Sequence, residues 1–412
     1  MTTTQLTTFT ELKGGICAPK GFKAGGIHSG IRKNKEKLDL ALLVSDMPCA
    51  TAAVYTQNKV KGAPILVTQA NIANGYSQAM LCNSGNANTC NHDGVELAQQ
   101  CCELVAKATG LKATDVVIAS TGVIGQPLPL EPFVNFIPKL TACLSENGGT
   151  LAAQAIMTTD THHKEFALEF VLNGKVCKIG AMTKGSGMIH PNMATMLTFI
   201  TTDVAITPEM LKQALQNEVK QSLNQISVDG DTSTNDMATV MANGLAGNAL
   251  INEMNDDYQI FCDALHQVCV WACRQIAKDG EGATKLLECT VNNASNSTVA
   301  LAIAKSIISS DLFKSAMFGA DANWGRALCA IGYTSGDFSV NNIELRLKSD
   351  KGEILVCKHS SYFPFDEDLA KEVLSAPEIQ ILVDMNDGNV MAQAWGCDLT
   401  YEYVRINGDY RS

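Results

Sequence analysis

The chain has 412 residues, of which 46% are hydrophobic and 18% charged, so it can build a sizeable core and disorder is excluded for most of it. The net charge is −11, without a Lys/Arg cluster, which argues against nucleic acid or an anionic membrane as a partner. The charge is uneven, with 16 Lys/Arg against 13 Asp/Glu in residues 1–194 (net +3) and 15 against 29 in residues 195–412 (net −14).

The N-terminal stretch lacks the basic and apolar segments of a secretory signal, and no apolar run reaches 18 residues. The 15 cysteines include no CxxC pair. We therefore expect a cytoplasmic protein whose cysteines are mostly buried as small hydrophobic residues. Cys262, Cys269 and Cys273 fall on one face of a predicted helix, where core packing is a better interpretation than metal binding.

The first half of the chain mixes predicted strands with one helix. Apolar runs between glycine-containing turns predict strands at residues 38–46, 63–70 and 116–120. Apolar residues at helical spacing predict a helix over residues 95–108, for which Asp93 is the expected N-cap.

The second half has clearer helix signals. Thr207-Pro208-Glu209 combines an N-cap, a first-turn proline and an acidic residue, which the helix dipole stabilises at this end. Further helices are predicted over about 257–278, ending before Gly280, and near 311–318. Strands are predicted at residues 299–304, 343–347, 353–357, 379–385 and 389–395, with Asp387-Gly388 as a tight hairpin turn between the last two.

Helices and strands alternate along the whole chain, which predicts an α/β or α+β fold built in layers. The length favours two lobes or one large fold. No linker rich in Pro, Ser or Gly separates two domains.

The segment KGSGMIHPNMATML (184–197) is unusual because glycines and a proline precede a small residue, a threonine and an apolar run. A strained bend there would let the Thr195 hydroxyl attack the preceding carbonyl and cut Ala194–Thr195. The new α-amine, with an ordinary pKa of about 8, could then activate the same hydroxyl. The alternative is that Thr195 is an ordinary strand residue.

This segment resembles the self-processing segment of the ornithine acetyltransferase family, the glutamate N-acetyltransferases of arginine biosynthesis. Similar blocks occur in the family's order at NSGNAN (83–88), STGVIG (120–125), AIMTTDT (155–161), ISVDGDTSTND (226–236), DGEGATK (279–285), GADANWGR (319–326) and VRINGDYRS (404–412). The resemblance therefore covers essentially the whole chain.

The resemblance implies a layered fold of helices on β-sheets with an N-terminal-nucleophile type of site. It implies an α chain, residues 1–194, and a β chain, residues 195–412, assembled as α2β2. Thr195 would be the nucleophile, and Thr121 and Gly122 would form the oxyanion hole, although Thr-Gly after a strand is also an ordinary turn. The implied substrate contacts are Thr158, Lys184, Thr195, Glu281, Asn407 and Ser412.

These residue types suit an N-acetylated diamino acid. We assign Lys184 to the substrate α-carboxylate and Glu281 to a cationic amine; the alternatives are a solvated loop lysine at Lys184 and a frayed end at Ser412. The implied reaction moves acetyl from N2-acetyl-L-ornithine to L-glutamate. Some family members also take acetyl-CoA, and no residue of this chain decides between the two types.

A related hypothesis is an amidohydrolase or aminopeptidase with a self-exposed threonine, and a different one is a small-ligand-binding protein that keeps the fold uncut. No cofactor or metal is expected, since the acidic loop at Asp229 lacks the glycine and glutamate of a calcium site and His162-His163 has no zinc partners. The chain departs from the usual family pattern at His190, Ala322 and Ser412. A solvated loop imidazole is the preferred interpretation of His190.

Overall fold

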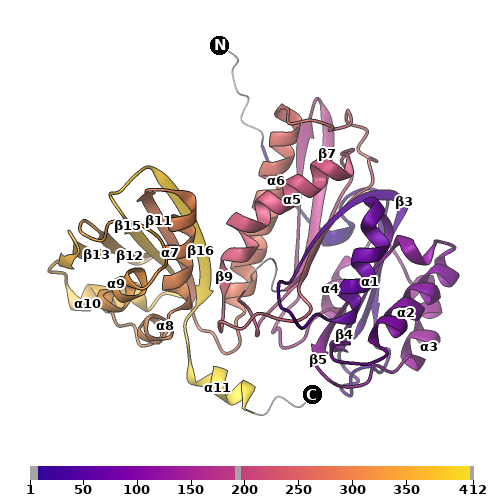
Figure 1. Cartoon of the computed structure of the whole chain (residues 1–412), viewed down its shortest axis with the longest axis horizontal. Helices are drawn as coiled ribbons and strands as arrows, with labels where there is room; N and C mark the ends of the chain where they lie inside the picture. Colours follow the sequence, from indigo (N-terminus) through magenta and orange to yellow (C-terminus); the bar gives the residue numbers. More distant parts are fainter. Residues whose placement is uncertain (1–7, 191–195, 409–412) are drawn as a thin grey trace.

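The computed structural model describes residues 8–190 and 196–408, which form two mixed β-sheets covered by helices (Figure 1). Within these residues the larger sheet has nine strands. They are β1 (Thr10–Leu12), β2 (Phe22–Ile27), β3 (Leu40–Tyr55), β4 (Tyr76–Asn86), β5 (Val116–Val123), β6 (Lys164–Leu172), β7 (Lys175–Lys184), β8 (Leu197–Thr202) and β10 (Met237–Ala242). Their order is β1-β6-β7-β8-β10-β3-β4-β5, with β2 on β3.

The smaller sheet forms the lobe at the left of Figure 1 and has seven strands among the described residues. They are β9 (Ile226–Ser227), β11 (Leu286–Ala294), β12 (Glu344–Ser349), β13 (Gly352–Lys358), β14 (Ser361–Tyr362), β15 (Glu378–Asp384) and β16 (Val390–Cys397). Their order is β14-β13-β12-β15-β11-β16-β9. The predicted layered α/β class is therefore confirmed.

Helices pack on both sheets. They are α1 (Ala63–Asn71), α2 (Gly94–Thr109), α3 (Glu131–Ala142), α4 (Gly149–Ala155), α5 (Pro208–Gln221), α6 (Asp256–Lys278), α7 (Ser297–Ser309), α8 (Asp311–Phe318), α9 (Trp324–Gly332), α10 (Glu367–Leu374) and α11 (Tyr401–Asn407). Helix α6 contacts strands of both sheets. Within the described ranges, 3₁₀ turns lie at Gly15–Cys17, Ile72–Asn74, Ala113–Asp115 and Leu223–Gln225. No helix in the described ranges is long and apolar enough to cross a membrane.

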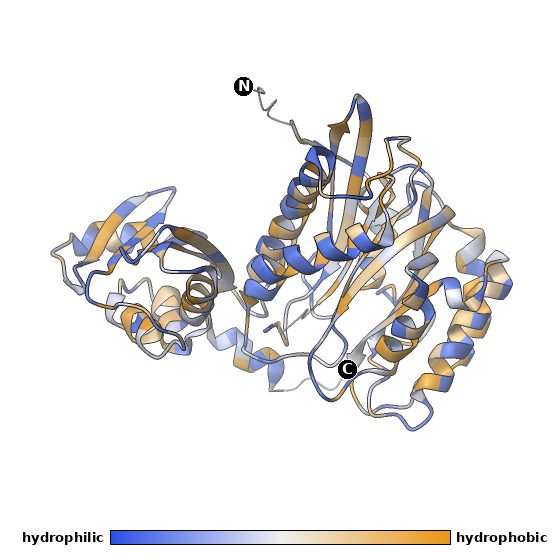
Figure 2. Ribbon diagram, turned by 45° about the horizontal axis from the view of Figure 1, so that its top comes forward, coloured by the Kyte–Doolittle hydropathy of each residue, from blue (hydrophilic) through white to orange (hydrophobic). Residues whose placement is uncertain are grey.

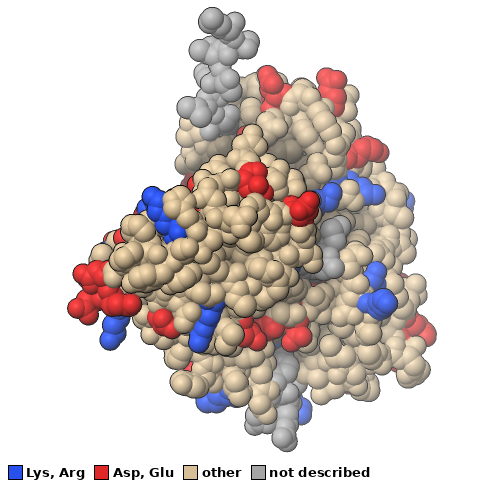
Figure 3. All heavy atoms as spheres, turned by 60° about the vertical axis from the view of Figure 1, so that its left-hand side comes forward, with Lys and Arg blue, Asp and Glu red and all other residues tan. Residues whose placement is uncertain are grey.

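The main core lies where α5 and α6 pack on β3, β6, β7, β8 and β10. Hydrophilic and hydrophobic residues alternate along both helices in Figure 2, as expected for amphipathic helices with one buried face. A second core joins α1, α2 and α3 to β4 and β5, and a third fills the smaller lobe under α7 and α10. Charged side chains are scattered over the face in Figure 3 between large uncharged areas.

In the sequence, position 194/195 falls between β7 and β8, which both belong to the larger sheet. Strand β8 pairs antiparallel with β7 and parallel with β10, and β10 pairs with β3. Strands from both sides of residue 195 are therefore hydrogen-bonded neighbours. The strands of the smaller sheet follow residue 286, where β11 begins, except for the short strand β9.

Most predicted elements are confirmed. The strands expected at 38–46 and 116–120 are parts of β3 and β5, and those at 343–347, 353–357, 379–385 and 389–395 correspond to β12, β13, β15 and β16. The helices expected at 95–108, about 257–278 and 311–318 are α2, α6 and α8. Helix α5 begins as predicted, because the Thr207 hydroxyl accepts a hydrogen bond from the Met210 amide. Cys269 and Cys273 are buried in the core, with Cys262 packed against it.

Four local predictions differ from the structure. Residues 63–70 and 299–304 are helical, not extended; Pro64 in the first turn starts α1, and the Asn296 side chain caps α7. Asp387-Gly388 does not close a hairpin, because β11 lies between β15 and β16. Asp93 precedes α2 as expected, but its side chain makes no capping hydrogen bond.

The packing of α6 can be tested at Leu265, whose side chain is fully buried between this helix and the larger sheet. Leu265→Ala should lower the free energy of unfolding by about 2–5 kcal/mol, because it leaves a cavity in the core. Urea denaturation measures the change. The exposed Leu250 provides the control, since Leu250→Ala should change this free energy by less than about 0.5 kcal/mol. Equal effects would contradict this assignment of the core.

Candidate functional site

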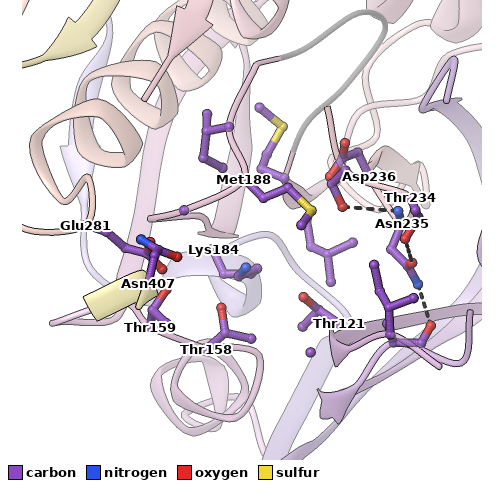
Figure 4. Close-up of a pocket in the computed structure, with 18 residues that line it drawn as sticks. Thr121, Thr158, Thr159, Lys184, Met188, Thr234, Asn235, Asp236, Glu281 and Asn407 are labelled. Carbon is purple, nitrogen blue, oxygen red and sulfur yellow. Dashed lines mark hydrogen bonds between the residues drawn. The ribbon is translucent and has the colours of Figure 1, made fainter. Parts of the chain in front are cut away.

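A single pocket collects most of the predicted site residues (Figure 4). Its lining includes Thr121, Gly122, Thr158, Lys184, Glu281 and Asn407. Ala194, Thr195 and Ser412 lie outside the described residues. Met196, which follows Thr195 in the chain, also lines the pocket. The pocket thus combines residues from both sides of position 194/195.

Thr121 and Gly122 lie within β5, near its end, where β5 pairs parallel with β4, so they are not a turn after the strand. Gly122 has φ +130°, and a Cβ there would lie 2.3 Å from the carbonyl carbon of Gly85. Only glycine fits this close approach without moving the neighbouring strand. This part of β5 places a threonine and a glycine in the lining of the pocket, a combination that suits a developing oxyanion.

Lys184 ends β7 and is only 7% exposed, so it is not the solvated loop lysine considered above. Burial lowers the pKa of Lys184, while the negative charge of Asp160 opposes this shift. An anionic group bound in the pocket would favour the charged form of this lysine.

A buried ion network lies behind Lys184. The Lys164 ammonium is 2.6 Å from Asp160 Oδ1 and 2.5 Å from Asp279 Oδ2, and all three side chains are almost fully buried. Burial opposes ionisation of Asp160, but the charges of Lys164 and Lys184 outweigh it and hold the pKa of Asp160 below its ordinary value. The network joins the start of β6 to the end of α6.

Asp160 also accepts hydrogen bonds from two backbone amides beside residues that line the pocket. Its Oδ2 accepts a hydrogen bond from the Thr158 amide at 2.8 Å, and its Oδ1 accepts one from the Gly185 amide at 2.8 Å. The positions of Thr158 and Lys184 therefore depend on one buried carboxylate. Neither Asp160 nor Lys164 was predicted from the sequence, because their role follows from burial and not from a motif.

Glu281 comes from the loop after α6 and faces the pocket from the opposite side to Thr121 (Figure 4). Its backbone amide donates to Ser186 O at 3.0 Å, and its Oε2 accepts from Asn407 Nδ2 at 2.6 Å. A Cβ on Gly187 would lie 2.3 Å from the Glu281 carboxyl carbon, so a larger residue there would displace the end of the Glu281 side chain. Asn407, the last residue of α11, thus donates a hydrogen bond directly to the Glu281 carboxylate.

His190 is half-buried and not a solvated loop imidazole, which corrects the preferred interpretation from the sequence. Its Nδ1 lies 3.0 Å from the Ser227 hydroxyl. Burial, together with the charge of Lys305, lowers the pKa of His190 to about 4, although Asp229 opposes the shift. Within residues 8–190 and 196–408, no group of three or more His, Cys, Asp or Glu side chains is placed to hold a metal ion.

Thr121 and Gly122 share the pocket with the cation of Lys184 and with the Glu281 carboxylate, and this combination suits acyl transfer between small charged molecules. The comparisons agree. Residues 23–412 match the ArgJ family. The arginine biosynthesis bifunctional protein ArgJ of Caldanaerobacter subterraneus subsp. tengcongensis is 49% identical over 402 residues, which are 97% of this chain and 99% of that protein. The protein of the same name from Geobacillus kaustophilus is 44% identical over 412 residues, 100% of this chain and 98% of that protein.

A crystal structure of ArgJ from Bacillus halodurans is 46% identical, with a TM-score of 0.50. The match covers 52% of this chain and 99% of the chain in that crystal structure. The chain therefore belongs to the ArgJ family, and it is an acetyltransferase of arginine biosynthesis.

The buried ion network can be tested with Lys164→Met, which leaves Asp160 and Asp279 without their shared cation. We expect the free energy of unfolding to fall by about 3–5 kcal/mol, because an uncompensated buried charge remains. Chemical denaturation measures the loss. Lys175→Met on the neighbouring strand is the control, since Lys175 is exposed and its loss should be nearly neutral. Equal stability of the two variants would show that the network does not hold the site.

Proposed function

We propose that the enzyme moves the acetyl group of N2-acetyl-L-ornithine to L-glutamate through an acetyl ester on Thr195. The observation that carries the proposal is the pocket itself. It combines Thr121 and Gly122 of β5, Lys184 and the Glu281–Asn407 pair with Met196, the residue after the proposed nucleophile. Family membership supports the same reaction.

The reaction has two halves. In the first, the Thr195 α-amine takes the proton of the Thr195 hydroxyl, and Oγ attacks the acetyl carbonyl. The C–N bond then breaks as the ornithine nitrogen gains a proton, so that ornithine leaves as the free amine. Thr121 and Gly122 stabilise the oxyanion that forms. In the second half, the amine of glutamate attacks the acetyl ester, releasing N-acetylglutamate and the threonine hydroxyl.

The charges of the pocket suit these substrates. Lys184 binds the α-carboxylate of the amino acid, and Glu281 binds the side-chain ammonium group of ornithine. Thr158 and Asn407 orient the substrate by hydrogen bonds, with Ser412 as a further contact that the family resemblance implies. The second substrate, glutamate, replaces ornithine at the same lysine.

We also propose that the chain cuts itself between Ala194 and Thr195, giving an α chain (1–194) and a β chain (195–412). The pairing of β8 with β7 supports this, because the fragments would remain joined by sheet hydrogen bonds. The crystal structure of the relative, whose chain corresponds to about half of this one, is also consistent with a cut chain. We further propose that two α chains and two β chains assemble as α2β2 and that the enzyme acts in the cytoplasm.

The relatives are called bifunctional, which supports a second activity. Acetylation of glutamate from acetyl-CoA is our proposal for it, and acetyl-CoA would then be a co-substrate. Two assays test the proposed reactions. Incubation with N-acetylornithine should give N-acetylglutamate only when glutamate is present, whereas free acetate at the same rate without glutamate would indicate a hydrolase. Incubation of glutamate with acetyl-CoA tests the second donor.

The self-cleavage can be tested on a denaturing gel. The wild-type chain should give bands of about 21 and 23 kDa, in proportion to 194 and 218 residues of 44.0 kDa. Thr195→Ala removes the attacking hydroxyl and should leave one uncut, inactive chain. Thr195→Ser keeps a hydroxyl and should retain part of both activities. A wild-type protein that is active and uncut would contradict the scheme.

The role of Glu281 can be tested by substrate choice. Glu281→Gln keeps the shape and the contact with Asn407 but removes the charge, so kcat/KM for N2-acetylornithine should fall by roughly 10- to 100-fold, as for a lost charged hydrogen bond. An acetylated analogue without the side-chain amine should lose much less. Equal losses for the two donors would refute the assigned contact.

A further inference from the structure

One titratable group in the pocket is unused by the reaction scheme above. Asp236 lies immediately before β10 and lines the pocket on the same side as Thr121 (Figure 4). Its side chain is buried, and its Oδ2 has no hydrogen-bond partner among the described residues. A buried polar atom without a partner is costly, so its retention in a pocket wall points to a role with a ligand.

The position of Asp236 is set by its neighbours. Its backbone carbonyl accepts a hydrogen bond from the Thr56 amide at 3.0 Å. The next residue, Met237, donates its amide to Met196 O at 2.9 Å and pairs with Leu197 in the parallel ladder. Asp236 therefore stands beside Met196 on the adjacent strand, about 4.8 Å away in the hydrogen-bonding direction.

The same segment is joined to the part of β5 that carries Thr121. Asn235 Nδ2 donates to Ser120 O at 3.0 Å and to Ala87 O at 2.6 Å, while Asn235 Oδ1 accepts from Thr89 and Thr234 at 2.6 Å each. Ser120 directly precedes Thr121, and Asp236 directly follows Asn235. These hydrogen bonds therefore connect the two chain segments that bring Thr121 and Asp236 into one pocket.

The surroundings favour the neutral acid. Burial raises the pKa of Asp236 well above its ordinary value, although Ser233 and the charge of Lys184 oppose the shift. Among the described residues, Lys184 at the end of β7 is the charged group that acts on Asp236, and β8 contributes no titratable side chain.

We propose that Asp236 is the general acid that protonates the departing amine and the general base that deprotonates the entering one. The inference rests on the proposed two-step transfer through Thr195. As the C–N bond breaks, the Asp236 carboxyl gives its proton to the ornithine nitrogen, leaving a carboxylate while the Thr195 amine holds the hydroxyl proton. In the second half, the carboxylate takes a proton from the attacking amine of glutamate, and the Thr195 ammonium returns its proton to Oγ. All protons are then restored.

The leaving group provides a sharp test. An amine must be protonated to leave, whereas the nitrophenolate of 4-nitrophenyl acetate leaves without a proton. Asp236→Asn keeps the shape of the side chain, so it should slow acetylation of the enzyme by saturating N-acetylornithine by roughly 10²- to 10⁴-fold, the usual range for general acid catalysis. The same variant should release nitrophenolate at nearly the wild-type rate. Asp231→Asn, an exposed aspartate in the same loop, is the matched control and should change neither rate.

A purely structural role would predict equal losses with both donors, and that result, or no loss with N-acetylornithine, would overturn the proposal. If Asp236→Asn does not mature, the wild-type enzyme supplies a second measurement. As pH rises through the pKa of Asp236, acetylation by N-acetylornithine should slow, whereas nitrophenolate release should not. If the rates of both reactions fall in the same way at high pH, the role is refuted. A wild-type enzyme that forms no acetyl ester with either donor would instead contradict the proposed two-step transfer.

Discussion

The insertion of β8 between β7 and β10 is the constraint on which the site depends. Residues 197–202 are bonded on one side to the strand that ends in Lys184 and on the other to the strand that follows Asp236. The pocket is therefore assembled by sheet pairing across position 194/195. A cut at this position would give two polypeptides. They would remain hydrogen-bonded through the strand pairs β7–β8 and β3–β10 and packed in one core with α5 and α6. The opposite net charges, +3 and −14, would add a weaker attraction between them.

The charged side chains that line the pocket are buried and, among the described residues, are not positioned by ion pairs at the surface. The charge of Asp160 favours the charged form of Lys184, and its carboxylate accepts hydrogen bonds from the backbone amides of Thr158 and Gly185. Glu281 lines the same pocket and accepts a hydrogen bond from Asn407 of the C-terminal helix. A cation and a carboxylate in one pocket suit an amino acid with a carboxylate at one end and an ammonium group at the other.

The sequence predicted the class of fold and much of the pocket, for different physical reasons. Helix α5 follows from local chemistry at Thr207-Pro208, and the site residues Thr121, Lys184, Glu281 and Asn407 lie in blocks that resemble the family. Residues 63–70 and 299–304 were misassigned because short apolar runs fit a strand or a buried helix equally well. The hairpin at Asp387-Gly388 failed because β11, which precedes it by about ninety residues, intervenes. Asp160, Lys164 and Asp236 were missed because burial and neighbouring charges, which no local pattern contains, determine their roles.

The central claim is that acetyl passes through a threonine ester in this pocket. Mass spectrometry of the purified protein after exposure to N2-acetylornithine without glutamate tests it most directly. The account predicts a fragment that begins at Thr195 and carries the mass of one additional acetyl group, which is lost as N-acetylglutamate forms on adding glutamate. Rapid transfer between the two substrates with no acetyl group on that fragment at any time would contradict it.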